Sequence, residues 1–218
     1  EGTRSGVYAA RLTTNEGEDY IPFFVRPKKG RPSAKIAFLA PTNNYLAYGD
    51  EHMEDLPIEM FPNQNMELNQ EECQYISNHN LGSIYDLHSD GSGICYVSRL
   101  RPIVNMRPKY IFRTFNCYRH FPADLYLLYW METKGYDFDV ITDEDLHFEG
   151  LDLLAPYKVI VTGSHPEYTS GSMLVALEDY LKDGGRMMYL GGNGFYWVTS
   201  FDPQRPHILE VRKWGGTR

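Results

Sequence analysis

The second half of the chain alternates continuous apolar runs with amphipathic segments. Tyr157 to Thr162 is an almost unbroken apolar, β-branched run, which is the pattern of a strand buried on both faces inside a parallel sheet. Ser170 to Lys182 then carries apolar residues at helical spacing. Upstream, Pro122 to Lys134 predicts another helix and Tyr136 to Thr142 another strand. Strands that alternate with helices predict an α/β fold with a doubly wound, mostly parallel sheet.

Two more apolar runs extend the predicted sheet. Lys35 to Ala40 and Arg186 to Leu190 have the same buried-strand character, and each ends in polar residues. Between the strands, the sequence from Thr142 to Asp145 resembles a capping box and predicts the start of a short helix. The α/β pattern therefore begins at about Ala34.

The residues before Ala34 have a different character. Gly6 to Leu12 and Tyr20 to Val25 are β-rich runs joined by a polar turn, which predicts a β-hairpin. A polar, proline-containing linker follows. We interpret residues 1–33 as a hairpin and linker at the edge of a preceding module, and 34–218 as the α/β domain, truncated at its C-terminal end.

Two stretches show no sustained period. Glu51 to Leu81 is acidic and long for a plain connection, so we expect a lid or binding loop. Arg99 to Thr114 is basic and irregular, and we interpret it as a surface segment whose charge is solvated. Short strand-like runs occur at Ile94 to Val97 and at His207 to Val211.

Charge and composition narrow the classes of partner. The chain has 218 residues and a formal net charge of −8, without clustered Lys and Arg, which argues against a nucleic-acid or anionic-membrane partner. Its apolar runs are shorter than the roughly 20 residues of a membrane span. Three cysteines without CxxC spacing indicate neither a disulfide framework nor a zinc-thiolate site. We therefore expect a cytoplasmic protein that acts on a small molecule.

Polar side chains follow three of the predicted strands. Because the carboxyl ends of parallel strands meet at one edge of a sheet, these residues are expected to share a crevice. They are Asn43, Asn44, Tyr45, Ser164, His165, Glu167 and Asn193. Without Lys or Arg, this set does not favour a phosphate pocket, and the GGNG stretch lacks the lysine of a P-loop. Serine hydrolysis is disfavoured because Ser164 and His165 are adjacent and the GxSxG pattern is absent.

Several longer motifs carry a family resemblance. In order, they are YIPFFVRP, KIAFLAPTNNYLAYGDE, GSIYDLHSDGSG, GYDFDVITDEDLH, GSHPEY and GGNGFYW. From about Gly6 to Arg218 the chain resembles the large (beta) subunit of the N,N-dimethylformamidase family. The resemblance implies a class I glutamine-amidotransferase-like (flavodoxin-like) domain and a mononuclear ferric ion held by two tyrosines and one glutamate. It also implies an oligomer, and leaves open whether a small companion subunit is needed.

The implied activity is metal-dependent hydrolysis of small N-substituted formamides, which converts N,N-dimethylformamide to dimethylamine and formate. Carried over by motif, the metal ligands are Tyr45, Tyr85 and Glu167, with Tyr48 as the alternative to Tyr45 in the same motif. Two phenolates and a carboxylate are hard oxygen donors whose charge a ferric ion would neutralise, whereas zinc favours nitrogen and sulfur. His165 would act as general base or acid, and Asn193 as donor to the oxyanion.

Each of these residues also has a structural interpretation that the sequence leaves open. Glu167 can cap the following helix, His165 can serve as a hydrogen-bonding group, and Asn193 can supply a left-handed backbone conformation. The alternative function is a non-catalytic amidotransferase-like domain used for interaction or assembly, since α/β sheets of this kind host many functions.

Overall fold

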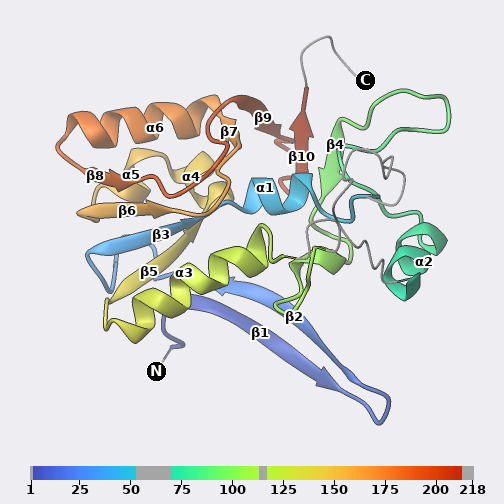
Figure 1. The fold of residues 1–218 in the computed structure, drawn as a ribbon. Coiled ribbons are helices and arrows are strands. Elements are labelled where there is room, and N and C mark those ends of the chain that lie inside the picture. Colours follow the sequence, from blue (N-terminus) through green and yellow to red (C-terminus); the bar gives the residue numbers. More distant parts are fainter. Residues whose placement is uncertain (1, 53–69, 113–116, 213–218) are drawn as a thin grey trace.

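The central sheet of the molecule is parallel, as the sequence predicts. The computed structural model describes residues 2–52, 70–112 and 117–212 (Figure 1). Four strands pair in the order β5-β3-β6-β8, all in parallel. Their bounds are β3 Ile36–Ala40, β5 Phe138–Thr142, β6 Val159–Thr162 and β8 Arg186–Met188. The chain passes from β3 to β5 on one side and then returns to β6 on the other, so the strand order reverses between β3 and β6.

Helices cover both faces of this sheet, and side chains alternate along its strands to meet them. One face carries α6, α4 and α5, and the other carries α3 (Figure 1). Ala37 and Leu39 of β3 belong to the cluster under α6, whereas Phe38 and Ala40 belong to the cluster under α3. The helix bounds are α3 Phe121–Thr133, α4 Asp143–Glu149, α5 Leu151–Leu154 and α6 Gly171–Lys182. The continuous apolar runs are thus explained by burial on two sides.

The predicted capping box is confirmed. The Thr142 hydroxyl accepts from the Asp145 backbone N–H at 3.2 Å, and the Asp145 carboxylate accepts from the Thr142 backbone N–H at 3.1 Å. Two backbone donors at the start of α4 are satisfied in this way. Ser170 caps α6, where its hydroxyl accepts from the Met173 N–H.

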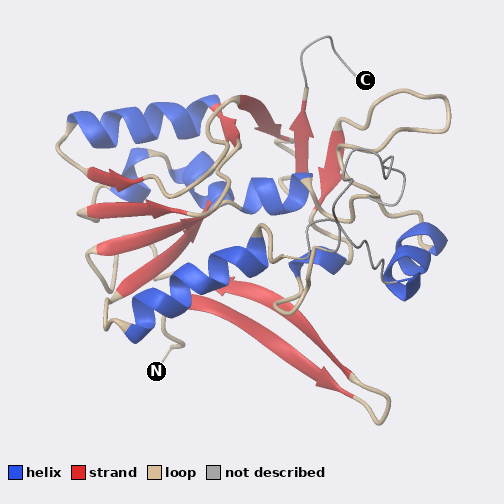
Figure 2. Ribbon diagram, viewed as in Figure 1, coloured by secondary structure: helices blue, strands red, loops and turns tan. Residues whose placement is uncertain are grey.

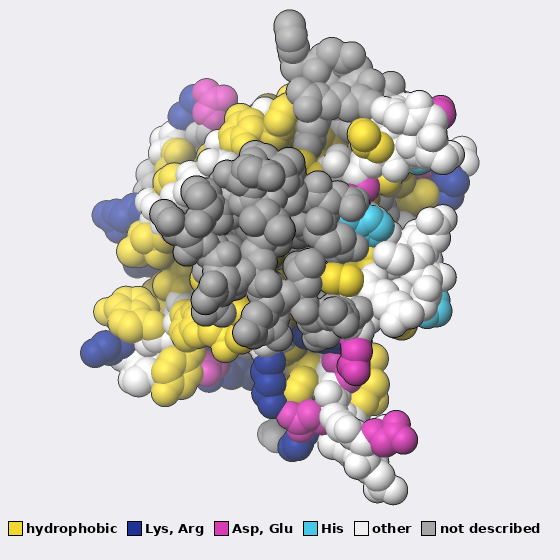
Figure 3. Space-filling model, turned by 45° about the vertical axis from the view of Figure 1, so that its right-hand side comes forward, with side chains coloured by type: hydrophobic (Ala, Val, Ile, Leu, Met, Phe, Trp, Pro, Cys, Tyr) yellow, Lys and Arg dark blue, Asp and Glu magenta, His cyan; other side chains and the backbone are white. Residues whose placement is uncertain are grey.

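The N-terminal hairpin is also confirmed, and its base packs on the α/β core. Strands β1 (Gly6–Thr13) and β2 (Glu18–Val25) are antiparallel. Val7 and Phe24 contact the cluster under α3, and the Ser5 hydroxyl accepts from the Val140 N–H at 2.8 Å. The far end projects from the body, with acidic and basic side chains close together near it (Figure 3).

A second sheet stands beside the first, and the sequence did not predict it (Figure 2). Its order is β4-β10-β9-β7, with β7 and β9 parallel and the other pairs antiparallel. The bounds are β4 Tyr96–Ser98, β7 Tyr168–Ser170, β9 Trp197–Phe201 and β10 Ile208–Val211. The strand-like runs around β4 and β10 were recognised, but their pairing joins segments more than 100 residues apart in the sequence. Helix α1 (Thr42–Ala47) packs against this sheet through Leu46 and Ala47.

Two interpretations of the irregular stretches need correction. Part of the predicted lid is a helix, α2 (Gln70–Asn78), and residues 53–69 lie outside the described residues. The basic stretch contains a short 3-10 helix, η3 (Val104–Met106). Its Arg101 is not solvated, because the side chain is only 13% exposed and forms an ion pair with fully buried Asp50. The sequence shows the charge of Arg101 but not its distant acidic partner.

None of the helices in the described part of the chain combines the length and the apolar character needed to cross a membrane.

A buried carboxyl at the start of α4 makes the stability of the fold depend on pH. Asp143 is 4% exposed, and burial raises its pKa to about 8, although the Asn43 N–H at 3.0 Å opposes the shift. A carboxyl whose pKa is higher in the folded than in the unfolded chain, where it is about 3.9, stabilises the fold most at low pH. This stability is lost as the pH rises towards and through the folded pKa.

We therefore expect Asp143→Asn to raise the melting temperature relative to the wild type at pH 9 and to have progressively less effect towards pH 4. Thermal unfolding followed by circular dichroism across this range measures the difference. The same change at exposed Asp152 is the control for a general charge effect. An equal gain for both variants at pH 9 would contradict the assignment to Asp143.

Candidate metal centre

The residues of the candidate site follow β3 and β6, where the strand order of the central sheet reverses. In open α/β sheets, ligands bind at such a point. After β6 the chain turns at Gly163, where a Cβ atom would lie 2.6 Å from both the Asp124 carboxylate and the Pro41 ring. Only glycine lets the turn pack this closely against its neighbours. The turn leads directly to Glu167.

The Glu167 carboxylate is the centre of a buried hydrogen-bond cluster. Its side chain is 1% exposed. Oε2 accepts from the Tyr48 hydroxyl at 3.0 Å. Oε1 accepts from the Tyr196 hydroxyl, and it also accepts from Asn193 Nδ2, at 3.4 Å. Glu167 and Asn193, which the sequence placed in one crevice, therefore do meet.

Two further phenols extend this cluster. The Tyr85 hydroxyl donates to the Tyr48 hydroxyl at 2.7 Å and is also hydrogen bonded to the Tyr168 hydroxyl. The rings of Tyr48 and Tyr85 stack with their centroids 4.5 Å apart. Tyr85 is 42% exposed and Tyr196 is 50% exposed, so the cluster reaches the surface of the described structure at these two rings.

Tyr45 does not lie in this cluster. Its hydroxyl donates to the Asp124 carboxylate, and its ring packs against Phe24 and Phe121 in the core under α3. Tyr48, the alternative in the same motif, is the tyrosine that contacts Glu167. The two differ because Tyr45 lies within α1 and faces the central sheet, whereas Tyr48 is the C-terminal cap of α1 and packs towards the second sheet.

The Asn44 side chain links the two strand ends. With its amide nitrogen directed at acceptors, it donates to the His165 carbonyl and to Glu167 Oε2, both at 3.3 Å. Its amide oxygen then accepts from His120 Nδ1 at 2.6 Å. Asn44 is fully buried, so all three contacts are shielded from water.

Two histidine rings border the cluster. His120 stacks on Tyr48 at 4.4 Å, and its ring lies 5.5 Å from that of His165. His120 Nε2 and His165 Nδ1 are buried and have no hydrogen-bond partner among the described residues. Burial and the nearby Arg119 guanidinium lower the pKa of both histidines, so both are neutral at pH 7.

The phenols of the cluster are held in their protonated form. Burial is the largest cause that raises the pKa of Tyr48, Tyr85, Tyr168 and Tyr196, and the Glu167 charge adds to it in each case. Arg119 opposes this shift at Tyr48, where its guanidinium lies 4.7 Å from the ring centroid. Deprotonation of these phenols at neutral pH therefore needs a cation at the oxygen atoms.

The oxygen cluster fits a hard cation better than a zinc-type metal. Among the described residues, no group of three or more His, Cys, Asp and Glu side chains is placed to hold a metal ion. Phenol and carboxylate oxygens nevertheless converge at Tyr48, Tyr85 and Glu167, and hard oxygen donors suit a hard, highly charged ion. Orphaned nitrogens beside them are also consistent with a polar group that completes the site.

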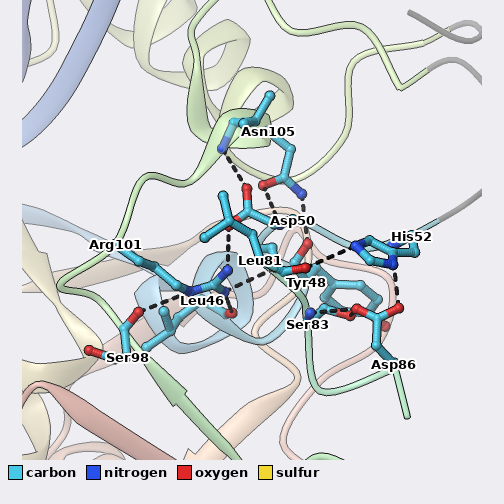
Figure 4. Close-up of polar contacts among 12 residues, drawn as sticks. Leu46, Tyr48, Asp50, His52, Leu81, Ser83, Asp86, Ser98, Arg101 and Asn105 are labelled. Atoms are coloured by element: carbon cyan, nitrogen blue, oxygen red, sulfur yellow. Dashed lines mark hydrogen bonds and ion pairs between the residues drawn. The ribbon is translucent and has the colours of Figure 1, made fainter. Parts of the chain in front are cut away.

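A buried polar network holds the segments that carry Tyr48 and Tyr85 (Figure 4). Arg101 pairs with Asp50 and donates to the Gly49 carbonyl at 3.0 Å. Asn105 Nδ2 donates to the Tyr48 carbonyl at 2.7 Å. There is no room for a side chain at Gly49, because a Cβ atom would lie 2.7 Å from the Arg101 guanidinium.

A second part of this network supports the Tyr85 turn (Figure 4). The Asp86 carboxylate accepts from the Ser83 N–H at 2.6 Å and from the His52 N–H at 3.4 Å. The Ser83 hydroxyl in turn accepts from the Tyr85 N–H at 3.0 Å. Both candidate tyrosine ligands are thus positioned by hydrogen bonds to their own backbone or to adjacent residues.

The sequence missed several residues of the cluster. The candidates did not include Tyr168, His120 or Arg119, although Tyr168 ends the GSHPEY motif. Nothing in the spacing of His120 or Arg119 indicated that they would pack against Tyr48. Asn44, by contrast, was expected at the crevice, and it does contact Glu167.

The fold and the site together define an α/β protein with a buried cluster of phenol and carboxylate oxygens at a sheet edge. The family model described as N,N-dimethylformamidase beta subunit-like, C-terminal, matches residues 1–218. The chain belongs to this family, which confirms the resemblance carried by the sequence motifs.

Two individual proteins with this family name are similar in sequence to the chain. The chain is 44% identical over 218 residues to the N,N-dimethylformamidase beta subunit of Paracoccus aminophilus, and 43% identical over 219 residues to that of Alcaligenes sp. Each match covers 98% of this chain and 28% of the relative. The chain therefore spans little more than a quarter of the length of these proteins.

The buried ion pair behind Tyr48 leads to a stability prediction. We expect Arg101→Met to destabilise the fold by about 3–5 kcal/mol, because Asp50 would remain buried without its partner. Urea unfolding measures the loss. The matched control is Arg99→Met, which breaks a half-exposed pair with Glu144 and should cost about 0–1 kcal/mol. Equal losses for the two variants would show that Arg101 is not a buried anchor.

Proposed function

We propose that this chain supplies the metal-binding part of an iron-dependent amidohydrolase that cleaves the C–N bond of small N-substituted formamides. N,N-dimethylformamide would be converted to dimethylamine and formate. The observation that carries the proposal is the convergence of Tyr48, Tyr85 and Glu167, in a chain whose relatives are named N,N-dimethylformamidase beta subunits. The activity is proposed for the whole protein, because the chain matches only 28% of each relative.

The proposed ligand set is Tyr48, Tyr85 and Glu167. The sequence motif allowed either Tyr45 or Tyr48 as the first ligand, and we choose Tyr48 because it contacts Glu167. Two phenolates and one carboxylate carry three negative charges, which a single ferric ion balances. A divalent ion would leave a net negative charge in a buried site, which is unfavourable. A bound ferric ion supplies Lewis acidity, which polarises a carbonyl and makes bound water more acidic.

The neighbouring residues have separate roles in this proposal. Asn193 Nδ2 already donates to Glu167 at 3.4 Å and is placed to donate to an oxyanion at the same site. His165 is neutral at pH 7, and its buried Nδ1 is free to take a proton from water or to return one to the leaving amine.

The sheet supports a finer fold assignment. Counted by chain order within the sheet, β5-β3-β6-β8 is the order 2-1-3-4, which matches the first four strands of the flavodoxin-like arrangement. We propose a class I glutamine-amidotransferase-like domain on this basis. The turn after β6 is Gly163-Ser164-His165 and carries no cysteine nucleophile, so the domain would use metal chemistry in place of thiol chemistry.

The proposal also covers partners and location. The relatives are named as beta subunits, and we propose an oligomer with a companion subunit, a small amide as the substrate and a cytoplasmic location.

The direct test combines metal content, colour and activity in the complete natural polypeptide. We expect about one iron per site, a visible charge-transfer band from tyrosinate bound to ferric ion, and release of formate from N,N-dimethylformamide. A colourless, iron-free protein obtained from iron-replete cells would refute the proposal and favour an interaction or assembly domain.

A pair of tyrosine variants tests the ligand assignment. Tyr48→Phe should abolish the charge-transfer band or shift it strongly and lower the iron content by at least tenfold, because it removes a phenolate donor. Tyr45→Phe removes only the hydrogen bond to Asp124, so iron content should stay normal while stability falls by about 1 kcal/mol. Iron analysis and visible absorption distinguish the two. The reverse pattern would return the ligand role to Tyr45.

A further inference from the structure

His120 occupies a strained position next to the proposed metal site. It is the N-cap of α3 and has φ of 54° and ψ of −121°, a conformation that non-glycine residues adopt rarely and at a cost of about 1–3 kcal/mol. Its side chain is 6% exposed, and it makes no side-chain capping hydrogen bond to α3. The His120 carbonyl accepts from the Asp124 N–H at 3.0 Å at the start of α3, but the imidazole ring does not cap the helix and makes its contacts elsewhere.

The hydrogen bonds around Asn44 fix the orientation of its amide. The His165 carbonyl and the Glu167 carboxylate can only accept, so the Asn44 nitrogen faces them at 3.3 Å. The amide oxygen then faces His120 Nδ1 at 2.6 Å. A contact of this length between an oxygen and a ring nitrogen requires the nitrogen to donate. His120 thus carries a proton on Nδ1 and uses it to hold Asn44.

A chain of donors therefore runs from His120 through Asn44 to Glu167 Oε2. Tyr48 donates to the same oxygen at 3.0 Å, but a tyrosine that binds a cation as phenolate has lost this proton. Among the described residues, Asn44 would then be the remaining donor to Oε2. The other oxygen, Oε1, keeps its contacts with Tyr196 and Asn193.

We propose that His120 is a positioning residue which, through Asn44, fixes the Glu167 carboxylate in the orientation that binds the metal ion. This inference rests on the proposed function, because it assumes that Glu167 is a ligand. Groups that orient a metal ligand by hydrogen bonding commonly change metal affinity 10- to 100-fold when they are removed. This relay, the hydrogen-bonded path from His120 through Asn44 to Glu167, also gives a reason for a histidine at this strained backbone position.

The competing explanation is that His120 only packs. Its ring stacks on Tyr48 at 4.4 Å and lies edge-on to His165 at 5.5 Å, and both contacts could be made by a plain aromatic ring. His120→Phe keeps the stacking but removes the donor. His120→Asn loses the stacking but keeps a donor near the place of Nδ1, and asparagine tolerates positive φ better than most residues.

The experiment measures iron affinity and the charge-transfer band in the complete natural polypeptide, by titration of the iron-free protein with ferric ion delivered from a chelator. We expect His120→Phe and Asn44→Leu each to weaken iron binding about 10- to 100-fold and to shift the band. His120→Asn should restore most of the affinity. Because one relay is cut in each case, the double variant His120→Phe/Asn44→Leu should bind no more weakly than Asn44→Leu alone.

Three outcomes would overturn the relay. The first is wild-type iron affinity and an unchanged charge-transfer band in His120→Phe. The second is an equal loss of iron affinity in His120→Phe and His120→Asn when circular dichroism shows both to be folded. The third is additive losses of iron affinity in the double variant. The wild-type titration separates this inference from the one it rests on. If the wild-type protein itself binds no iron, the proposed function fails and the relay fails with it, whereas normal wild-type binding with unaffected variants overturns the relay alone.

Discussion

The buried carboxylate of Glu167 is the constraint on which the rest of the site depends. A carboxylate that is 1% exposed is costly to bury unless donors surround it. Four residues provide them, with Tyr48 and Asn44 on one oxygen and Tyr196 and Asn193 on the other. These donors come from the segments that follow β3 and β8, so satisfying one side chain fixes how separate loops meet at the sheet edge.

The two sheets make different contributions to this arrangement. The parallel sheet delivers Glu167 and Asn44 to its carboxyl edge, because β3 and β6 are neighbours and end at the same level. The second sheet closes the site from the side: Tyr168 begins β7, and the loop before β9 carries Tyr196. The Arg101–Asp50 pair then anchors the connection that bears Tyr48 against this second layer.

Hydrogen bonds join the phenols of the cluster. Each of the four phenols has a hydrogen-bond partner within it. A cation that binds there would replace phenol protons. The orphaned nitrogens of His120 and His165 mark where the preformed hydrogen bonding is incomplete, and a substrate or water could complete it there.

The sequence by itself determined the parallel α/β core, because both of its signals are local patterns. Continuous apolar runs mark strands that are buried on two faces, and apolar residues at helical spacing mark helices with one buried face. It also determined the position of Glu167 and Asn193 at one crevice, since the rule that parallel strands end at a common edge needs no detail of packing. Its motifs carried the family.

Only the tertiary structure shows that Tyr48, and not Tyr45, contacts Glu167. Both tyrosines follow the same strand three residues apart, and the choice depends on which layer each ring packs against, the core under α3 or the second sheet. That second sheet, the buried Arg101 and the packing of His120 on Tyr48 likewise arise from contacts between residues far apart in the chain. Such contacts leave no periodic signal in the sequence, because their partners are set by the packing of whole layers.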